Sequence, residues 1–215
     1  MHQQPENTQR YRKRNYLCGY SHNTTLALTI MSENKYLYCL ESVKDVEAAM
    51  GSAILASMES LAKQYRITNV YKTCDCIEGF EESISTLLYE DRHFKDYAVI
   101  YLAFEGRNNE LKIGDFYYSF EEIAEFFEGK LKGKLIHFAN TLQLDLEEET
   151  FQYFLDVTGA KAVSGYVNAA PVLSTVLDNF YFYLSQEYDD VVELTETLFE
   201  KQPALCTGMG FRMYY

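Results

Sequence analysis

The sequence predicts an α/β fold, a three-layer αβα sandwich around a mostly parallel sheet of about six strands. Short runs of aromatic and β-branched residues alternate with amphipathic stretches, a pattern typical of βα units. One run, residues 97–104 (YAVIYLAF), is apolar nearly throughout, which predicts a central strand covered by helices on both faces. The length of 215 residues, 47% of them hydrophobic, suits a single domain with a substantial core.

The elements follow in order from the hydrophobic pattern. Strands are predicted at 35–41, 67–71, 97–104, 111–119 (a small hairpin or strand), 134–140, 160–166 and 208–215. Helices are predicted in the amphipathic stretches at 46–61, 78–90, 119–129, 148–157, 172–187 and 190–201, and in the first of them apolar residues recur at spacings of three and four. In the third helix Ser119 and Glu122 have the spacing of a capping box.

Charge is unevenly distributed along the chain. The net charge is −13 and the pI about 4.7, which argues against binding to nucleic acid or to an anionic membrane. Residues 1–30 carry four basic side chains and one acidic side chain, whereas 31–215 carry 15 basic and 31 acidic ones. We interpret 1–30 as a polar extension without the continuous apolar region of a signal peptide, either native or translated from a start upstream of Met31, and 31–215 as one domain.

Cysteines and histidines indicate structural roles. The five cysteines are scattered and odd in number, which predicts reduced thiols and a cytoplasmic protein. Cys74 and Cys76 lack the two-residue spacer typical of zinc or redox pairs. His137 lies inside an apolar strand, where alternation places Leu135, His137 and Ala139 on one face, so we expect a hydrogen-bonded histidine under a helix.

The carboxyl ends of the predicted strands form the candidate site. In an open parallel sheet, ligands and catalytic groups gather at this edge. The candidate cleft residues there are Glu41, Ser42, Glu105, Gly106, Asn140 and Thr141. An alternative is a metal-assisted site, because Glu41, Glu105, Asp115 and Asn140 offer oxygen ligands for a hard cation, although the sequence fixes no spacing between them. No cofactor is expected.

Several segments resemble a known family in their order along residues 35 to 190. They are YLYCLES, VIYLAFEG, LKIG, SFEEIAEFFEGKLKGKLIHFAN, FLDVTGAKAVSGY and STVLDNFYFYL. In this order the chain resembles caspase-like (clan CD, CHAT-like) bacterial proteins, and in particular an uncharacterised group of them. The resemblance implies a His-Gly pair after the third strand and a cysteine after the fourth, which together form a catalytic dyad. Here Glu105 stands at the histidine position and Thr141, preceded by Ala139 and Asn140, at the cysteine position.

The two replacements predict a pseudopeptidase. A carboxylate is a weak base for a threonine hydroxyl near neutral pH, so Glu105 and Thr141 do not substitute easily for the dyad. We expect a non-catalytic protein-binding or regulatory module, whose partner is another protein or peptide and in which Glu105 recognises a basic group. The alternatives are a hydrolase with a reassigned acidic or metal-assisted site and a flavodoxin-like protein with a small ligand. The oligomeric state stays open.

The abundance of aromatic residues bears on the binding hypothesis. The chain has 19 Tyr and 14 Phe but no Trp. Aromatic side chains exposed at the surface are enriched at protein interfaces, whereas the same residues also suit a tyrosine-rich core. Both interpretations remain open, and the tail at 208–215 is a candidate edge strand.

Overall fold

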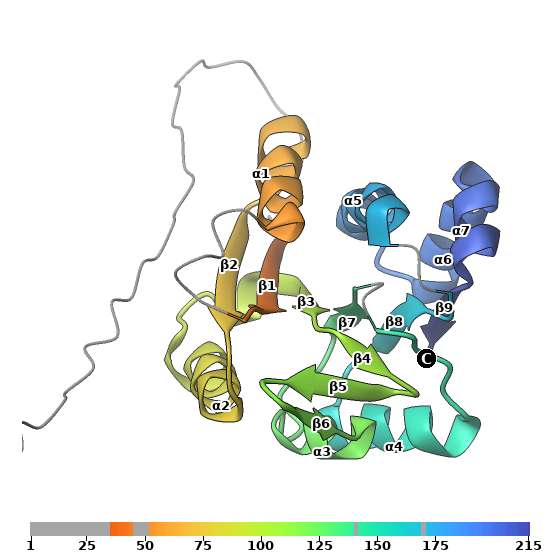
Figure 1. Ribbon diagram of the computed structural model, residues 1–215. Coiled ribbons are helices and arrows are strands. Elements are labelled where there is room, and N and C mark those ends of the chain that lie inside the picture. The colour runs from red at the N-terminus through yellow and green to blue at the C-terminus, as the bar shows by residue number, and fades with distance from the viewer. Residues whose placement is uncertain (1–34, 45–51, 140–141, 169–170) are drawn as a thin grey trace, which may run out of the picture.

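The computed structural model describes residues 35–44, 52–139, 142–168 and 171–215, with the side chains of 171–174 excepted. The predicted extension and its boundary at Met31 lie outside these residues. A six-stranded sheet of order β2-β1-β3-β7-β8-β9 forms the centre of the molecule (Figure 1). Every neighbouring pair in it is parallel except β8 with β9, so the predicted α/β class with a mostly parallel sheet of about six strands is confirmed.

The strands of this sheet lie close to their predicted ranges. They are β1 (Tyr36–Ser42), β2 (Asn69–Cys74), β3 (Tyr97–Ala103), β7 (Leu135–Phe138), β8 (Ala162–Tyr166) and β9 (Phe211–Tyr214). The predicted central strand, β3, lies between β1 and β7, and nearly all of its residues are buried. The C-terminal strand β9 pairs with β8 alone, as the edge-strand interpretation expects.

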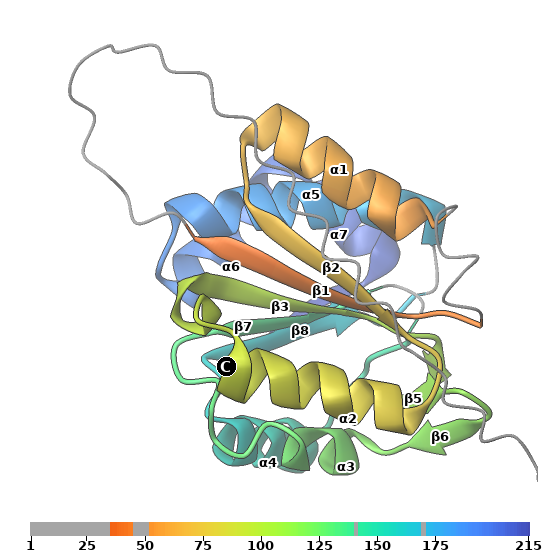
Figure 2. The same ribbon diagram turned by 90° about the vertical axis from the view of Figure 1, so that its left-hand side faces the viewer.

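Helices cover both faces of the sheet and complete three layers (Figures 1 and 2). One layer contains α1 (Ala53–Tyr65), α5 (Pro171–Glu187), α6 (Val191–Lys201) and α7 (Pro203–Met209). The opposite layer contains α2 (Ile77–Ser85), α3 (Phe120–Glu125) and α4 (Glu148–Thr158). A π-helical turn (η2, Thr86–Glu90) extends α2, and a short 3₁₀ turn (η3, Phe94–Asp96) leads into β3. In the described residues, no helix combines the length and apolar character needed to cross a membrane.

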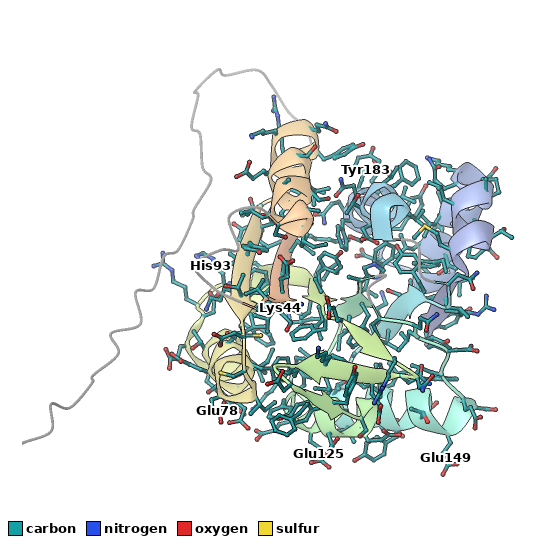
Figure 3. The ribbon with its side chains drawn as sticks, viewed as in Figure 1. Lys44, Glu78, His93, Glu125, Glu149 and Tyr183 are labelled. Carbon is teal, nitrogen blue, oxygen red and sulfur yellow. The ribbon has the colours of Figure 1, made fainter. Side chains whose placement is uncertain are left out.

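Alternation along the strands divides the core into two parts. In β3, Ile100 and Leu102 face α2, α3 and α4, whereas Val99 and Tyr101 face the layer with α1 and α5. Each fully buried large apolar side chain contributes about 1.5–3 kcal/mol relative to its exposed state. Figure 3 shows side chains filling the spaces between the sheet and both helix layers. The labelled Glu78, Glu125 and Glu149 lie on the outer surface of the layer formed by α2, α3 and α4, which is the lower layer in this view.

A small antiparallel sheet follows β3 and connects it to α3. It consists of β4 (Gly106–Arg107), β5 (Glu110–Ile113) and β6 (Phe116–Tyr118), so the predicted hairpin is present with an additional short strand. The predicted capping box is also present, because Glu122 N–H donates to Ser119 Oγ and Ser119 N–H donates to the Glu122 carboxylate. Helix α3 ends earlier than predicted, at Glu125.

Other elements also differ from the predictions. Helix α1 begins at Ala53 instead of residue 46, because the extended backbone at Ser52 makes this residue the N-cap; residues 45–51 lie outside the described part. Strand β2 is shifted toward Cys74 by its pairing with β1. Helix α7 was not predicted and occupies part of the range assigned to the last strand, since Pro203 starts a helix that Gly210 ends with φ +60°.

Candidate functional site

The carboxyl ends of β1, β3 and β7 lie side by side at one edge of the sheet. The Cα of Glu41 pairs with that of Ala103 and the Cα of Leu102 with that of Phe138, all in parallel ladders. This register places Glu41, Ser42, Glu105 and Gly106 at the same edge of the sheet, and that they form a binding cleft stays a prediction. The remaining candidates, Asn140 and Thr141, lie outside the described residues.

The carboxylate of Glu41 anchors the start of helix α1. Ser52 Oγ lies 2.8 and 2.6 Å from the two Glu41 oxygens, and the Tyr71 hydroxyl donates to the same carboxylate. Ser52 Oγ in turn accepts the N–H groups of Ile54 and Leu55 at the helix N-terminus. Burial is the main cause that raises the pKa of Tyr71, and the hydrogen bond to Glu41 is the second. The phenol therefore remains a hydrogen-bond donor at neutral pH. The surroundings of Glu41 therefore give this side chain a structural role.

Glu105 presents an exposed carboxylate at the junction between the two sheets. Its backbone is held in place, since the Glu105 carbonyl accepts the Lys112 N–H at 2.7 Å and the preceding Phe104 is fully buried. Gly106 has no room for a side chain, because a Cβ there would lie 2.2 Å from the Glu110 carbonyl oxygen. The position of Glu105 is thus fixed while its charge faces solvent.

The metal-assisted alternative depends on the convergence of acidic side chains. Asp115 lies in the turn between β5 and β6, and it is exposed. Within the residues that the structure describes, no three His, Cys, Asp or Glu side chains gather closely enough to hold a metal ion. Asn140, the amide in this set, lies outside those residues.

His137 belongs to a buried polar network that the sequence revealed only in part. Its Nδ1 lies 2.8 Å from Ser164 Oγ, and its Nε2 lies 3.0 Å from Asp178 Oδ1 on helix α5. Asp178 also accepts hydrogen bonds from the hydroxyls of Tyr101, at 2.9 Å, and Tyr166. The predicted structural histidine is confirmed. Asp178 was not predicted, although it is the only acidic residue in the otherwise uncharged stretch 171–186.

The serine, histidine and aspartate of this network are the residue types of a hydrolase triad, but they are sealed inside the protein. Ser164 and His137 have no exposed surface, and Asp178 is 1% exposed. The His137 ring stacks on Tyr101 at 5.5 Å and meets the edges of Tyr166 and Phe182 at 5.5 and 5.6 Å. No substrate reaches this serine in the folded state, so the network stabilises the contact between the sheet and α5.

The described cysteines are free thiols, and three of the four are buried. Burial raises the pKa of Cys39 well above its ordinary value, that of Cys74 to about 12 and that of Cys206 to about 11. At Cys76 a hydrogen bond from the Gly79 backbone lowers the pKa, but desolvation and the neighbouring Asp75 and Glu78 raise it by more, so the net direction is upward. These thiols are therefore protonated at neutral pH, which opposes nucleophilic catalysis.

Comparisons with known proteins give a family and a distant structural likeness. A model of a family of unknown function matches residues 34–215. The search of curated proteins found no match. Among solved structures, caspase-1 from Spodoptera frugiperda is similar, with 13% identity, a TM-score of 0.48 and coverage of 79% of this chain and 77% of the caspase. A likeness at this level says nothing about the activity of the chain.

Proposed function

The chain belongs to DUF6642, a family of unknown function, and we propose from its residues that it is a catalytically inactive caspase-like pseudopeptidase that acts as a protein-binding or regulatory module. The observation that carries this proposal is Glu105, an exposed carboxylate on a fixed backbone at the carboxyl edge of the sheet. By resemblance this position would hold a catalytic histidine. Its chemistry suits recognition of a cationic group better than proton transfer.

The groups available for hydrolysis support the absence of catalysis. A cysteine hydrolase needs a thiolate and a partner that exchanges protons near neutral pH. The described thiols have raised pKa values, and His137 is enclosed by aromatic side chains with Asp178 and Ser164. Glu105 is exposed to solvent, and a carboxylate is in general a poor base for a hydroxyl nucleophile near neutral pH.

The geometry around Glu105 supports binding. A ligand group that pairs with a side chain on a rigid backbone loses less affinity to the ordering of the protein than one that must order a loop. Glu105 meets this condition, because buried Phe104 precedes it and the paired strand β4 follows it. An Arg or Lys of a partner protein is the natural counterpart of the carboxylate.

Hydrolysis is tested with fluorogenic peptides that vary the residue before the cleaved amide, together with a thiol-directed covalent inhibitor. We expect no turnover above the buffer rate and no labelling of the native protein. Turnover that disappears in Glu105→Ala or in Thr141→Ala would overturn the inactive assignment, because it would show that the strand-end residues perform chemistry.

Binding is tested by selecting peptides from a displayed library on the wild-type protein and then measuring their affinity for Glu105→Ala. We expect selected peptides to contain Arg or Lys and to lose about two- to fivefold in affinity, which corresponds to about 0.5–1 kcal/mol for an exposed pair. Glu90→Ala is the matched control, because it removes an exposed carboxylate that precedes β3 and so lies toward the amino end of this strand instead of its carboxyl end. Equal loss in both variants would contradict a specific role for Glu105.

A further inference from the structure

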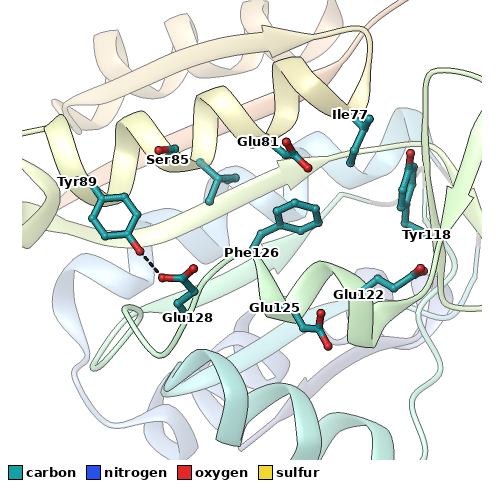
Figure 4. Close-up of a pocket in the computed structure, with 10 residues that line it drawn as sticks. Ile77, Glu81, Ser85, Tyr89, Tyr118, Glu122, Glu125, Phe126 and Glu128 are labelled. Carbon is teal, nitrogen blue, oxygen red and sulfur yellow. Dashed lines mark hydrogen bonds between the residues drawn. The ribbon is translucent and has the colours of Figure 1, made fainter.

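A groove on the lower layer of the molecule combines an apolar floor with acidic walls (Figure 4). It has a volume of about 530 Å³ and lies between α2 with η2 on one side and β6 with α3 on the other. This volume is within the range of sites that take a small ligand or a few side chains. None of the strand-end candidates lines it, so the groove is separate from the surface at Glu105.

The floor of the groove comes from one face of each bordering helix. Ile77, Glu81 and Ile84 have helical spacing on α2, and Glu122, Glu125 and Phe126 have it on and just after α3. Ile84 is fully buried, while Ile77 and Phe126 are partly exposed and offer apolar surface. Figure 4 shows Phe126 near the centre of the groove, with Tyr89 and Tyr118 at opposite ends.

The walls of the groove carry four exposed glutamates, which are Glu81, Glu122, Glu125 and Glu128. Glu122 caps α3, and Glu128 accepts a hydrogen bond from Tyr89. Within the described part of the chain, none of the four forms an ion pair with Lys or Arg, and they do not gather as the ligands of a metal ion. A ligand that complements them must therefore carry several positive charges at separated positions.

We propose that this groove binds a basic segment of a partner protein in which arginine residues alternate with apolar residues. In an extended peptide, successive side chains point to opposite faces, so apolar side chains can enter the floor while the cationic ones reach the glutamates. The net charge of −13 favours the approach of such a partner over long distances. This inference goes beyond the function proposed above, because it assigns a second surface and the chemistry of its ligand.

The two tyrosines at the ends of the groove favour arginine over lysine. A guanidinium is planar, stacks on aromatic rings and forms paired hydrogen bonds with carboxylates. The same protein displays this contact elsewhere, since Arg107 lies over the Tyr117 ring with its Cζ 4.0 Å from the centroid. At the Tyr89 end of the groove, Lys130 Nζ lies 5.3 Å from the ring centroid. This distance is longer than the 4.0 Å of the Arg107 contact, so the cation–π interaction of Lys130 with Tyr89 is the weaker of the two.

The proposal is tested by fluorescence anisotropy with the full chain and a fluorescein-labelled short peptide in which arginine alternates with leucine. We expect saturable binding that weakens with added salt. The double variant Glu81→Gln/Glu125→Gln should bind about five- to thirtyfold more weakly, as expected for two exposed pairs of about 0.5–1 kcal/mol each. The control Glu196→Gln/Glu200→Gln makes the same change in net charge on α6, in the opposite layer, and should bind like the wild type.

Further probes separate this proposal from its competitors. A peptide with citrulline in place of arginine should not bind, and spermine should compete poorly because it lacks apolar side chains. Equal loss in the groove and control variants, or equal affinity for spermine, would overturn the assignment. Binding seen only after Arg10, Arg12, Lys13 and Arg14 are changed to Gln would also overturn it, because the basic extension of the chain would then be the occupant. Glu105→Ala should leave this binding unchanged, so the two proposals fail independently.

Discussion

His137 and Asp178 are joined by a hydrogen bond of 3.0 Å between Nε2 and Oδ1 in the interior of the protein, where strand β7 meets helix α5. The two residues are 41 positions apart in the sequence. Asp178 also accepts from two tyrosine hydroxyls, so three donors surround one buried carboxylate. A buried charge with this many donors is tolerated, whereas removal of part of the arrangement leaves uncompensated polar groups.

We predict that Asp178→Asn lowers the free energy of unfolding by about 2–4 kcal/mol. The amide group would direct N–H donors toward Tyr101, Tyr166 or His137, which are themselves donors in the wild type. Urea denaturation measures this loss. The control Asp189→Asn removes a carboxylate that is paired with Lys35 but 91% exposed, and it should cost less than about 1 kcal/mol. Similar costs for both variants would contradict the structural role of the network.

The sequence predicts most of the fold because hydrophobic periodicity is a local signal. The apolar run of β3 and the alternation around His137 indicate a central strand and a strand with two different faces, and both are present. The predicted start of α1 was wrong because a cap overrides periodicity: the backbone of Ser52 is extended, and its side chain accepts two helix N–H groups. Helix α7 was missed because its seven residues are too few to show a period.

The candidate sites were predicted less completely, because side-chain partners depend on tertiary contacts. The carboxyl ends of parallel strands meet at one edge of the sheet, which places Glu41 and Glu105 there. The sequence does not show that Ser52 and Tyr71 form hydrogen bonds with the Glu41 carboxylate. The acidic groove requires α2 and α3 to be neighbours although β3 and the small sheet separate them in sequence. The buried network could have been predicted from one signal in the sequence. Asp178 is the only acidic residue in the stretch 171–186, which indicates a carboxyl group that needs polar partners.

Gly106 provides a test of the junction that positions Glu105. We predict that Gly106→Ala lowers the free energy of unfolding by about 2–3 kcal/mol, because the new Cβ would lie 2.2 Å from the Glu110 carbonyl oxygen and 2.4 Å from Leu142 Cδ1. Chemical denaturation measures the change. Gly208→Ala is the control, since its Cβ would meet nothing within 4 Å and alanine favours a helix by up to about 1 kcal/mol. A harmless Gly106→Ala would show that the junction is loose.

The buried tyrosines predict a loss of stability in alkaline solution. Burial raises the pKa of Tyr38, Tyr101, Tyr166 and Tyr181, with nearby acids adding to the effect at Tyr101 and Tyr166. Below pH 9 these phenols are protonated in both states and add no pH dependence. Above about pH 10 the unfolded chain releases the protons while the folded protein retains them, so stability falls with rising pH.

The expected slope is about 1.4 kcal/mol per pH unit for each such tyrosine, or about 5 kcal/mol per pH unit for four of them once the unfolded phenols are ionised. The decline begins slightly earlier, near pH 9, because burial also raises the pKa of Cys206 to about 11 and that of Cys74 to about 12. Denaturation at a series of pH values, followed with tyrosinate absorbance, measures the slope. Tyr181→Phe should reduce this slope by about 1.4 kcal/mol per pH unit, the contribution of one buried tyrosine. Ionisation of all tyrosines near pH 10 in the folded protein would contradict the buried network, because the Tyr101 and Tyr166 phenols must stay protonated to donate to Asp178.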